Sequence, residues 1–222
     1  MSGIVELRQY TLKPGMRDVL IELFEREFVE SQEALGMEII GTFRDADDPD
    51  RFVWLRGFSD MEARAKSLAA FYGGPVWRAH RNAANATMLD SDNVLLLRPA
   101  WSGSGFGGAG VRAPVGAMEL PSGVVAAVVC RFDAPVPEAF VAAFRNAIPA
   151  GQILAALVTE SAVNNFPALP IREGVNVFVW FTLHAELASA RRAALPLQLQ
   201  GVAIKPPEIL CLLPTARSRL HG

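Results

Sequence analysis

The sequence predicts an α+β fold made of two similar units of about 100 residues each, a usual size for a domain. Three observations predict it. Strand and helix patterns follow the order β-α-β-β-α-β in each half, a Gly/Ser-rich segment at 99–115 separates the halves, and the tripeptide Phe-Val-Trp occurs at 52–54 and again at 178–180. Two copies of one unit joined by a linker is the simplest interpretation of this repeat.

The first half begins with a strand, because residues 4–12 alternate with the two-residue period of a sheet. Ser59 or Asp60 can cap a helix that follows the third strand, and Pro75 suits the first turn of another. The predicted elements are a strand at 4–12, a helix at 16–34, strands at 37–44 and 52–58, helices from 59 to about 73 and from 75 to 88, and a strand at 93–98.

The second half repeats this order. Phe140, Val141 and Phe144 lie at helical spacing after a valine-rich strand. The predicted elements are a strand at 124–132, a helix at 137–147, strands at 152–160 and 175–183, a short helix at 186–194 and a strand at 208–213. We therefore divide the chain into a first ferredoxin-like unit (1–98), the linker (99–115) and a second ferredoxin-like unit (116–222).

A β-α-β-β-α-β unit forms a four-stranded antiparallel sheet with both helices on one face. The other face needs a cover, and a second sheet supplies it. The tandem copies predict an α+β barrel formed within one chain. Contact between the sheets of separate chains would serve equally well, so a homo-oligomer is also expected.

Composition excludes several classes of protein. The 222 residues are 51% hydrophobic and 20% charged, with a formal net charge of -2, which excludes a disordered chain and a basic nucleic-acid-binding surface. No apolar run is long enough to span a membrane. The first ten residues include Glu6 and Arg8, unlike a signal peptide. We expect a cytoplasmic protein without nucleic-acid or membrane partners.

Cysteine and histidine are scarce. Cys130 and Cys211 lie in apolar runs, which predicts buried free thiols. The three histidines have no second His, Cys or carboxylate at metal-ligand spacing. We therefore expect no metal and no cofactor.

The alternation of the first strand predicts which side chains face the second sheet. If Val5 and Leu7 lie under the helices, the residues predicted to face the barrel interior are Glu6, Arg8, Tyr10, Trp54 and Arg56. An interior with aromatic and charged walls is typical of a ligand cavity. The alternative is a structural ion pair between Glu6 and one arginine.

Two further segments are rich in functional groups. In FYGGPVWRAHRNAAN, Trp77 and His80 share a helical face, and an imidazole there could move a proton; the alternative is a histidine hydrogen-bonded to a neighbour. In NNFPALPIREG, the side chains of Asn164, Asn165 and Arg172 could orient a polar ligand; the alternative is asparagines that bond their own turn.

Three segments together resemble the NIPSNAP family: ELRQYTLKPG, FYGGPVWRAHRNAAN and NNFPALPIREGVNVFVWF. The resemblance extends, in order, over nearly the whole chain. It implies the fold of the dimeric α+β barrels, whose superfamily includes cofactor-independent monooxygenases, haem-handling enzymes and isomerases. Some eukaryotic members are associated with mitochondria and recruit partner proteins, a role that implies a targeting presequence not seen here. Fold-level analogy alone does not establish chemistry.

The first functional hypothesis is a protein that binds or transforms a small aromatic or carbonyl compound in the barrel interior. Tyr10 would donate to a developing oxyanion, Arg8 would stabilise the charge, and His80 would carry a proton.

The alternative is a non-enzymatic interaction module with a solid barrel core. A haem protein with one histidine ligand is a weaker third hypothesis. No Gly-rich phosphate loop lies between a strand and a helix, and no G-x-S-x-G motif occurs.

Overall fold

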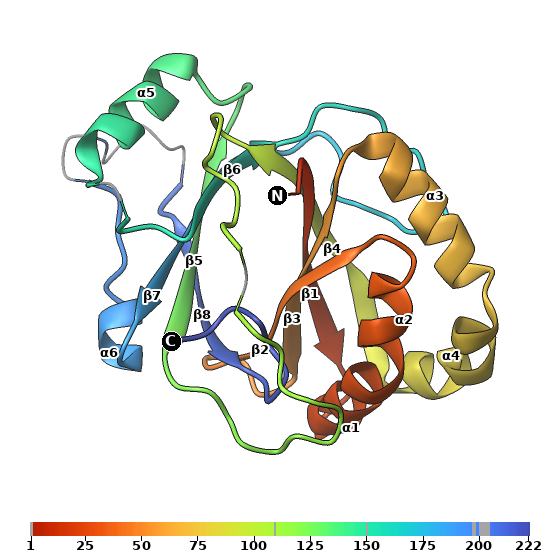
Figure 1. The fold of residues 1–222 in the computed structure, drawn as a ribbon. Helices are drawn as coiled ribbons and strands as arrows, with labels where there is room; N and C mark the ends of the chain where they lie inside the picture. Colours follow the sequence, from red (N-terminus) through yellow and green to blue (C-terminus); the bar gives the residue numbers. More distant parts are fainter. Residues whose placement is uncertain (1, 109, 150, 197–198, 200–204) are drawn as a thin grey trace.

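The computed structural model describes residues 2–108, 110–149, 151–196, 199 and 205–222, and within them eight antiparallel strands close into a barrel (Figure 1). Around the barrel the strands follow the order β1-β3-β2-β8-β5-β7-β6-β4. Their bounds are β1 Ile4–Leu12, β2 Glu38–Asp45, β3 Arg51–Phe58, β4 Met88–Pro99, β5 Val124–Phe132, β6 Ala155–Thr159, β7 Asn176–His184 and β8 Glu208–Pro214.

Each half of the chain forms one side of the barrel with the same strand order. The first half is ordered β4-β1-β3-β2 and the second β8-β5-β7-β6, as expected for two ferredoxin-like units. Two seams join the halves, and each seam contains three paired positions: β2 with β8, and β4 with β6. The halves therefore pair within one chain, which the sequence had left open.

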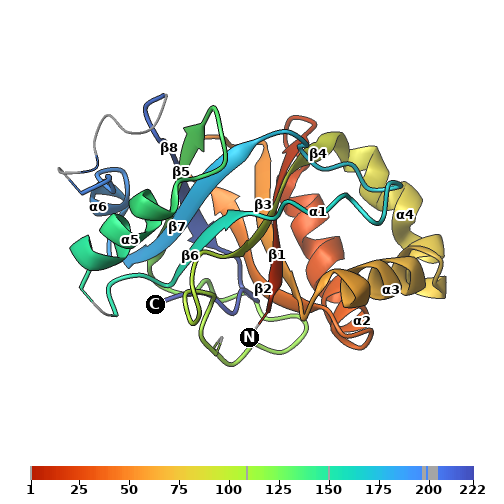
Figure 2. The same cartoon turned by 90° about the horizontal axis from the view of Figure 1, so that it is seen from above.

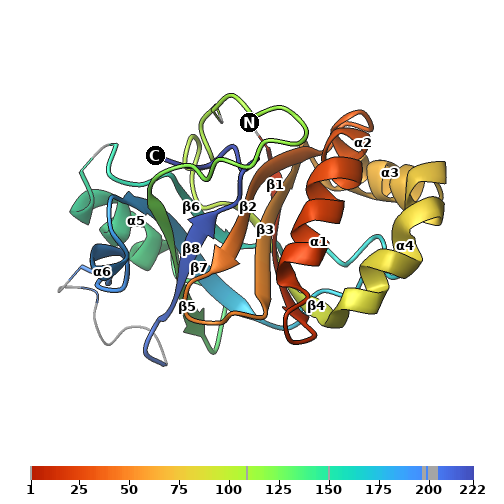
Figure 3. The same cartoon turned by 90° about the horizontal axis from the view of Figure 1, so that it is seen from below.

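Helices cover the outside of the barrel on two opposite sides (Figures 1 and 3). The first half carries α1 to α4 and the second carries α5 and α6. None of the described helices is long and apolar enough to cross a membrane. Their bounds are α1 Arg17–Leu23, the π-helical turn η1 Phe24–Phe28, α2 Val29–Glu33, α3 Met61–Tyr72, α4 Pro75–Thr87, α5 Glu138–Ala147 and α6 Leu187–Ala190.

The predicted helix boundaries in the first half follow from local chemistry. Asp60 caps α3, because its side chain accepts a hydrogen bond from the backbone N–H of Ala63 at 2.7 Å. Pro75 opens α4, where its missing N–H costs nothing. The predicted single helix at 16–34 is divided by the π-helical turn η1, a feature that often occurs near functional sites.

The barrel interior is a largely apolar core. It is packed with buried side chains from every strand, among them Leu7, Phe43, Leu55, Leu97, Val125, Leu157, Val179 and Leu212. Phe106, in the segment after β4, also packs into this core, 4.9 Å from Phe181 between ring centroids. The segment predicted as a linker therefore contributes to the barrel core.

The predicted orientation of the first strand is wrong. Val5 and Leu7 point into the barrel, and Glu6, Arg8 and Tyr10 lie beneath the helices. Trp54 and Arg56 lie with them, so the predicted ligand cavity inside the barrel does not exist at these residues. The interior of an eight-stranded barrel is just wide enough to be filled by side chains or to hold one small ligand. In this protein buried apolar side chains from all eight strands fill it.

Candidate functional site

A fully buried cluster of charges lies between the sheet of the first half and its helices. The carboxylate of Glu6 accepts hydrogen bonds from three guanidinium groups: from Arg8 Nη1 at 2.9 Å, from Arg56 Nη2 at 2.6 Å and from Arg64 Nε at 2.8 Å. None of the four side chains is more than 1% exposed. Three cations around one anion leave an excess of two positive charges.

Strand register brings most of this cluster together. Glu6 of β1 lies opposite Arg56 of β3, and Arg8 lies opposite Trp54. Alternate residues of a strand share a face, so Glu6 and Arg8 point the same way. Arg64 reaches them from α3 above. The cluster therefore joins two strands to the helix layer.

The charges of the cluster determine the protonation states of its members. Burial by itself would raise the pKa of Glu6, but Arg56, Arg8 and Arg64 together hold that pKa far below its ordinary value of 4.5. Burial lowers the pKa of Arg64, although Glu6 opposes this. An arginine stays protonated under all conditions a protein tolerates. The excess positive charge is therefore permanent.

Tyr10 is bonded to the cluster, and its hydroxyl proton has no acceptor among the described residues. Arg8 Nε donates to Tyr10 Oη at 3.0 Å. Because a guanidinium can only donate, the proton of the Tyr10 hydroxyl is left for another acceptor, and none stands in place among the described residues. Burial raises the pKa of Tyr10, so the hydroxyl is protonated at neutral pH. Tyr10 is thus a neutral donor next to a cation.

Tyr10 lines a cavity of about 320 Å³, which is within the range of small-molecule sites. Strands β1 and β4, helices α3 and α4 and a segment of the second half enclose it. Its lining carries no charged side chain and consists of Tyr10, Tyr72, Trp77, Asn85, Met88, Ser91, Phe166, Ala168 and Leu169. Four of these residues are aromatic. The cavity therefore suits a ligand with an aromatic body and few polar groups.

The second half supplies one wall of this cavity. Residues 160–175, here called the strap, connect β6 to β7 and reach across to α3 and α4 (Figure 2). Within the strap, Oδ1 of Asn164 and Oδ1 of Asn165 accept from Arg64 Nη1 at 3.0 and 2.9 Å. Asn165 Nδ2 also donates to the carbonyl of Met61 at 2.6 Å. The strap therefore holds Arg64 as well as covering the cavity.

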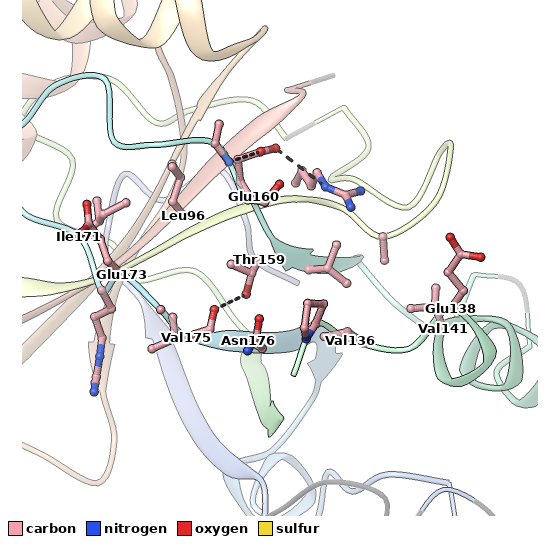
Figure 4. A pocket seen from close by; sticks show the side chains of 18 of the residues that line it. Leu96, Val136, Glu138, Val141, Thr159, Glu160, Ile171, Glu173, Val175 and Asn176 are labelled. Atoms are coloured by element: carbon pink, nitrogen blue, oxygen red, sulfur yellow. Dashed lines mark hydrogen bonds and ion pairs between the residues drawn. The ribbon is translucent and has the colours of Figure 1, made fainter. Parts of the chain in front are cut away.

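A larger hollow of about 1100 Å³ lies on the other side of the strap, over the seam of β4 and β6. Figure 4 shows Glu138 and Val141 of α5 on one side of it and Ile171 and Glu173 of the strap on the other. Its charges balance: the lining includes three arginines and three glutamates, namely Arg98, Arg145, Arg172, Glu138, Glu160 and Glu173. Its size exceeds that of the cavity at Tyr10, but it contains no excess charge.

The structure brings together most of the predicted site residues. Glu6, Arg8, Tyr10, Trp54 and Arg56 lie in one layer, though beneath the helices. Asn164 and Asn165 join them through Arg64, and Trp77 lines the cavity.

Two predicted site residues lie elsewhere. His80 lines neither hollow. Its half-buried ring lies 6.3 Å from the Phe28 ring between centroids, and its Nε2 lies 3.4 Å from Glu27 Oε2 on η1. A role for His80 as proton carrier in the barrel is therefore wrong. Arg172 lines the larger hollow, where its Nη1 donates to Asn93 Oδ1 at 3.3 Å.

Several residues of the site were missed from the sequence: Arg64, Gln32 and Tyr72, and the cavity residues Asn85, Met88, Ser91, Phe166, Ala168 and Leu169. Arg64 has a detectable signal, because it shares a helical face with the buried Leu68 and Phe71. Gln32 accepts from Arg56 Nη1 at 2.8 Å, and Tyr72 lines the cavity; neither has a comparable signal.

Among the described residues of the second half, the same layer holds no such cluster. Trp180 is the counterpart of Trp54, and in the strand register Val128 lies opposite Trp180 as Arg8 lies opposite Trp54. By the same register the counterparts of Glu6, Arg8, Tyr10 and Arg56 are Ala126, Val128, Cys130 and Thr182. The charges are therefore a property of the first half alone.

Comparison with known proteins matches the first half to a family. The family model for NIPSNAP matches residues 5–103. An uncharacterised NIPSNAP-like domain protein from Burkholderia xenovorans is 30% identical, over 43% of this chain and 84% of that chain, with a TM-score of 0.40. No curated protein matches this chain.

Two solved structures are similar over both halves. A candidate monooxygenase from Lactobacillus acidophilus is 13% identical over 98% of each chain, with a TM-score of 0.58. Another candidate monooxygenase, from Fusobacterium nucleatum, is 10% identical over 99% of this chain and 95% of that chain, also with a TM-score of 0.58. At such identities the likeness shows the shared fold alone.

Proposed function

Since the chain belongs to the NIPSNAP family, with residues 5–103 matching its model, we propose that it binds a small aromatic or carbonyl compound in the cavity lined by Tyr10. The ligand lies between the first-half sheet and its helices, where the aromatic rings of Tyr72, Trp77 and Phe166 surround it. This proposal keeps the ligand class expected from the sequence and moves the site out of the barrel.

One observation carries the proposal: the hydroxyl of Tyr10 is a buried donor whose proton has no acceptor among the described residues. A buried polar group without a partner costs about 1–3 kcal/mol. An oxygen atom of a ligand in the adjoining cavity would accept that proton. Arg8, bonded to the same hydroxyl, strengthens the donor because charge-assisted hydrogen bonds polarise one another.

The arrangement suits chemistry in which a carbonyl oxygen gains negative charge. A fixed, preorganised donor stabilises an enolate or a tetrahedral oxyanion more than it stabilises the neutral carbonyl. Tyr10 would serve as that donor, and Arg8 would hold its ring and hydroxyl in position. Isomerases and cofactor-independent monooxygenases both pass through such anions, so we propose a reaction of this type.

The test is a titration with 2-acetonaphthone, a neutral aromatic ketone, followed by isothermal calorimetry. Tyr10→Phe removes the hydroxyl and keeps the ring, and we expect it to weaken binding about two- to tenfold, as one hydrogen bond is worth about 0.5–1.5 kcal/mol. Arg81→Met, an exposed position on α4, is the control and should bind as the wild type does. Equal binding by Tyr10→Phe and wild type would contradict the role of Tyr10.

A second candidate function rests on a different observation. The barrel core is solid, as the interaction-module hypothesis requires, and large apolar side chains between β4 and β5 face solvent: Val111 is 93% exposed and Met118 is 89% exposed. We propose this function only as the alternative. It predicts no binding of small aromatic compounds at the Tyr10 cavity, so the calorimetric experiment also separates the two.

A further inference from the structure

The charge cluster suggests which chemical class of ligand the cavity selects. We propose that the ligand bound next to Tyr10 is an anion, an aromatic compound that carries a carboxylate or a stable enolate. The inference rests on the proposed function, because it concerns the same cavity. It adds a property that an aromatic lining alone does not imply.

The first step of the argument is the balance of charge. Glu6 is the only carboxylate among the described partners of Arg8, Arg56 and Arg64. Their other hydrogen-bond partners are neutral side chains, namely Tyr10, Gln32, Met37, Asn164 and Asn165. The cavity lining adds no charge of either sign. Two buried positive charges are thus left without an anion.

The second step is a shortage of acceptors. Arg64 Nη2 and Trp54 Nε1 are both buried donors with no hydrogen-bond partner among the described residues. The Trp54 ring lies between two cations, 5.5 Å from the guanidinium carbon of Arg8 and 4.9 Å from that of Arg56. With the proton of the Tyr10 hydroxyl, this layer holds three donor groups without an acceptor among the described residues, and of these three residues Tyr10 is the one that lines the cavity. A carboxylate, which accepts up to about four hydrogen bonds, is the complementary group.

The third step compares an anion with a neutral ligand. Burying unpaired cations costs several kcal/mol each, and the second half shows that this fold does not need them at the equivalent strand positions. Because a low-dielectric surrounding screens charge weakly, the field of the cluster extends through Tyr10 into the uncharged cavity. An anionic ligand gains from that field and a neutral ligand of the same shape does not.

The experiment uses two matched pairs of probes at pH 7.5: benzoate with benzamide, and 2-naphthoate with 2-naphthamide. Each pair differs in charge and hardly in shape. We expect wild-type protein to bind each carboxylate at least tenfold more tightly than its amide, measured by calorimetry or by saturation-transfer NMR. Arg64→Met removes one excess charge and should reduce this preference at least fivefold. Arg64→Lys keeps the charge and should retain most of it.

Controls separate charge in the cluster from charge elsewhere and from misfolding. Arg81→Met lowers the net charge of the protein equally, at an exposed site, and should leave the preference unchanged. Near-ultraviolet circular dichroism shows whether Arg64→Met retains its tertiary structure. If it does not, Glu6→Gln is the second variant: it raises the excess charge to three and should tighten carboxylate binding without affecting the amides.

The outcomes distinguish the two proposals. Equal affinity for carboxylate and amide overturns the anion proposal and leaves the proposed function in place. A preference that Arg64→Met and Glu6→Gln both leave unchanged also overturns it, because another group then supplies the charge. If wild-type protein binds no member of either pair, the proposed function is wrong and the anion proposal is wrong with it.

Discussion

The two helix-covered layers of the barrel have the same strand order and very different chemistry. Under the helices of the first half, Glu6, Arg8 and Arg56 form a charged network. At the equivalent positions of the second half, Ala126, Val128 and Thr182 occur, and the layer around Val128 is packed by residues such as Phe144 and Trp180. Both layers keep a buried tryptophan on the same strand position.

This difference teaches that the charges are not a requirement of the architecture. The second layer forms without charged side chains at these strand positions, so the fold does not depend on an ion cluster there. A buried salt bridge contributes little to stability compared with well-packed apolar residues. The contrast therefore supports the proposal that the network of the first half acts on a ligand in the cavity beside Tyr10.

The largest expected effect comes from breaking the network at its centre. Glu6→Ala leaves three buried guanidinium groups without their shared anion, and we expect it to lower the free energy of unfolding by about 3–5 kcal/mol. Urea denaturation followed by circular dichroism measures this. A loss below about 1 kcal/mol would show that the arginines find other partners, and that Glu6 is not the centre of the cluster.

Replacing the whole network sharpens the comparison. The variant Glu6→Ala/Arg8→Val/Arg56→Thr introduces the residues found at the equivalent positions of the second half. Adding Arg64→Met then removes the remaining cation of the cluster. We expect this fourfold variant to be more stable than Glu6→Ala alone by about 2 kcal/mol, since apolar replacement of a complete buried ion cluster is often neutral. It should also lose the preference for carboxylate probes. Stability equal to or below that of Glu6→Ala would mean that the two halves are not interchangeable in this layer.

The smallest expected effect is on the pH dependence of stability. The pKa of Glu6 lies well below 4.5 in the folded protein, so its contribution is fully present above that pH and is lost as pH falls, because the unfolded chain takes up the proton first. Between about pH 4.5 and pH 3, wild type should lose up to about 1.4 kcal/mol per pH unit more steeply than Glu6→Gln. Urea titrations at half-unit intervals measure both slopes. Parallel slopes would indicate that folding does not lower the pKa of Glu6, which would contradict its pairing with the arginines.

The sequence predicted the elements of the fold well, because the two periodicities are clear. The strand at 4–12 is confirmed at both ends, and the caps at Asp60 and Pro75 lie where the chemistry places them. It was harder to predict which face of each strand points into the barrel, because β1 is buried on both faces. The alternation of side chains along β1 divides them into two buried sets. It does not show which set lies in the barrel interior and which lies under the helices.

The site could be predicted only in part, for physical reasons. Glu6, Arg8 and Arg56 were found because charges inside strands are unusual. The link from the strap to Arg64 through Asn164 depends on chain segments 100 residues apart, and no local pattern encodes it. His80 was favoured because of its chemistry, but its distance from the cavity is set by how α4 packs, which periodicity does not determine.

The two three-residue seams have a consequence for how the cavity is maintained. When a barrel is assembled from separate subunits, dilution favours the dissociated parts. Here both halves belong to one chain, so closing the barrel is an intramolecular step. The effective concentration of one half near the other is set by the connecting chain and not by the amount of protein. The strap and the other residues that line the Tyr10 cavity all belong to one chain, so the formation of this cavity does not depend on the concentration of the protein.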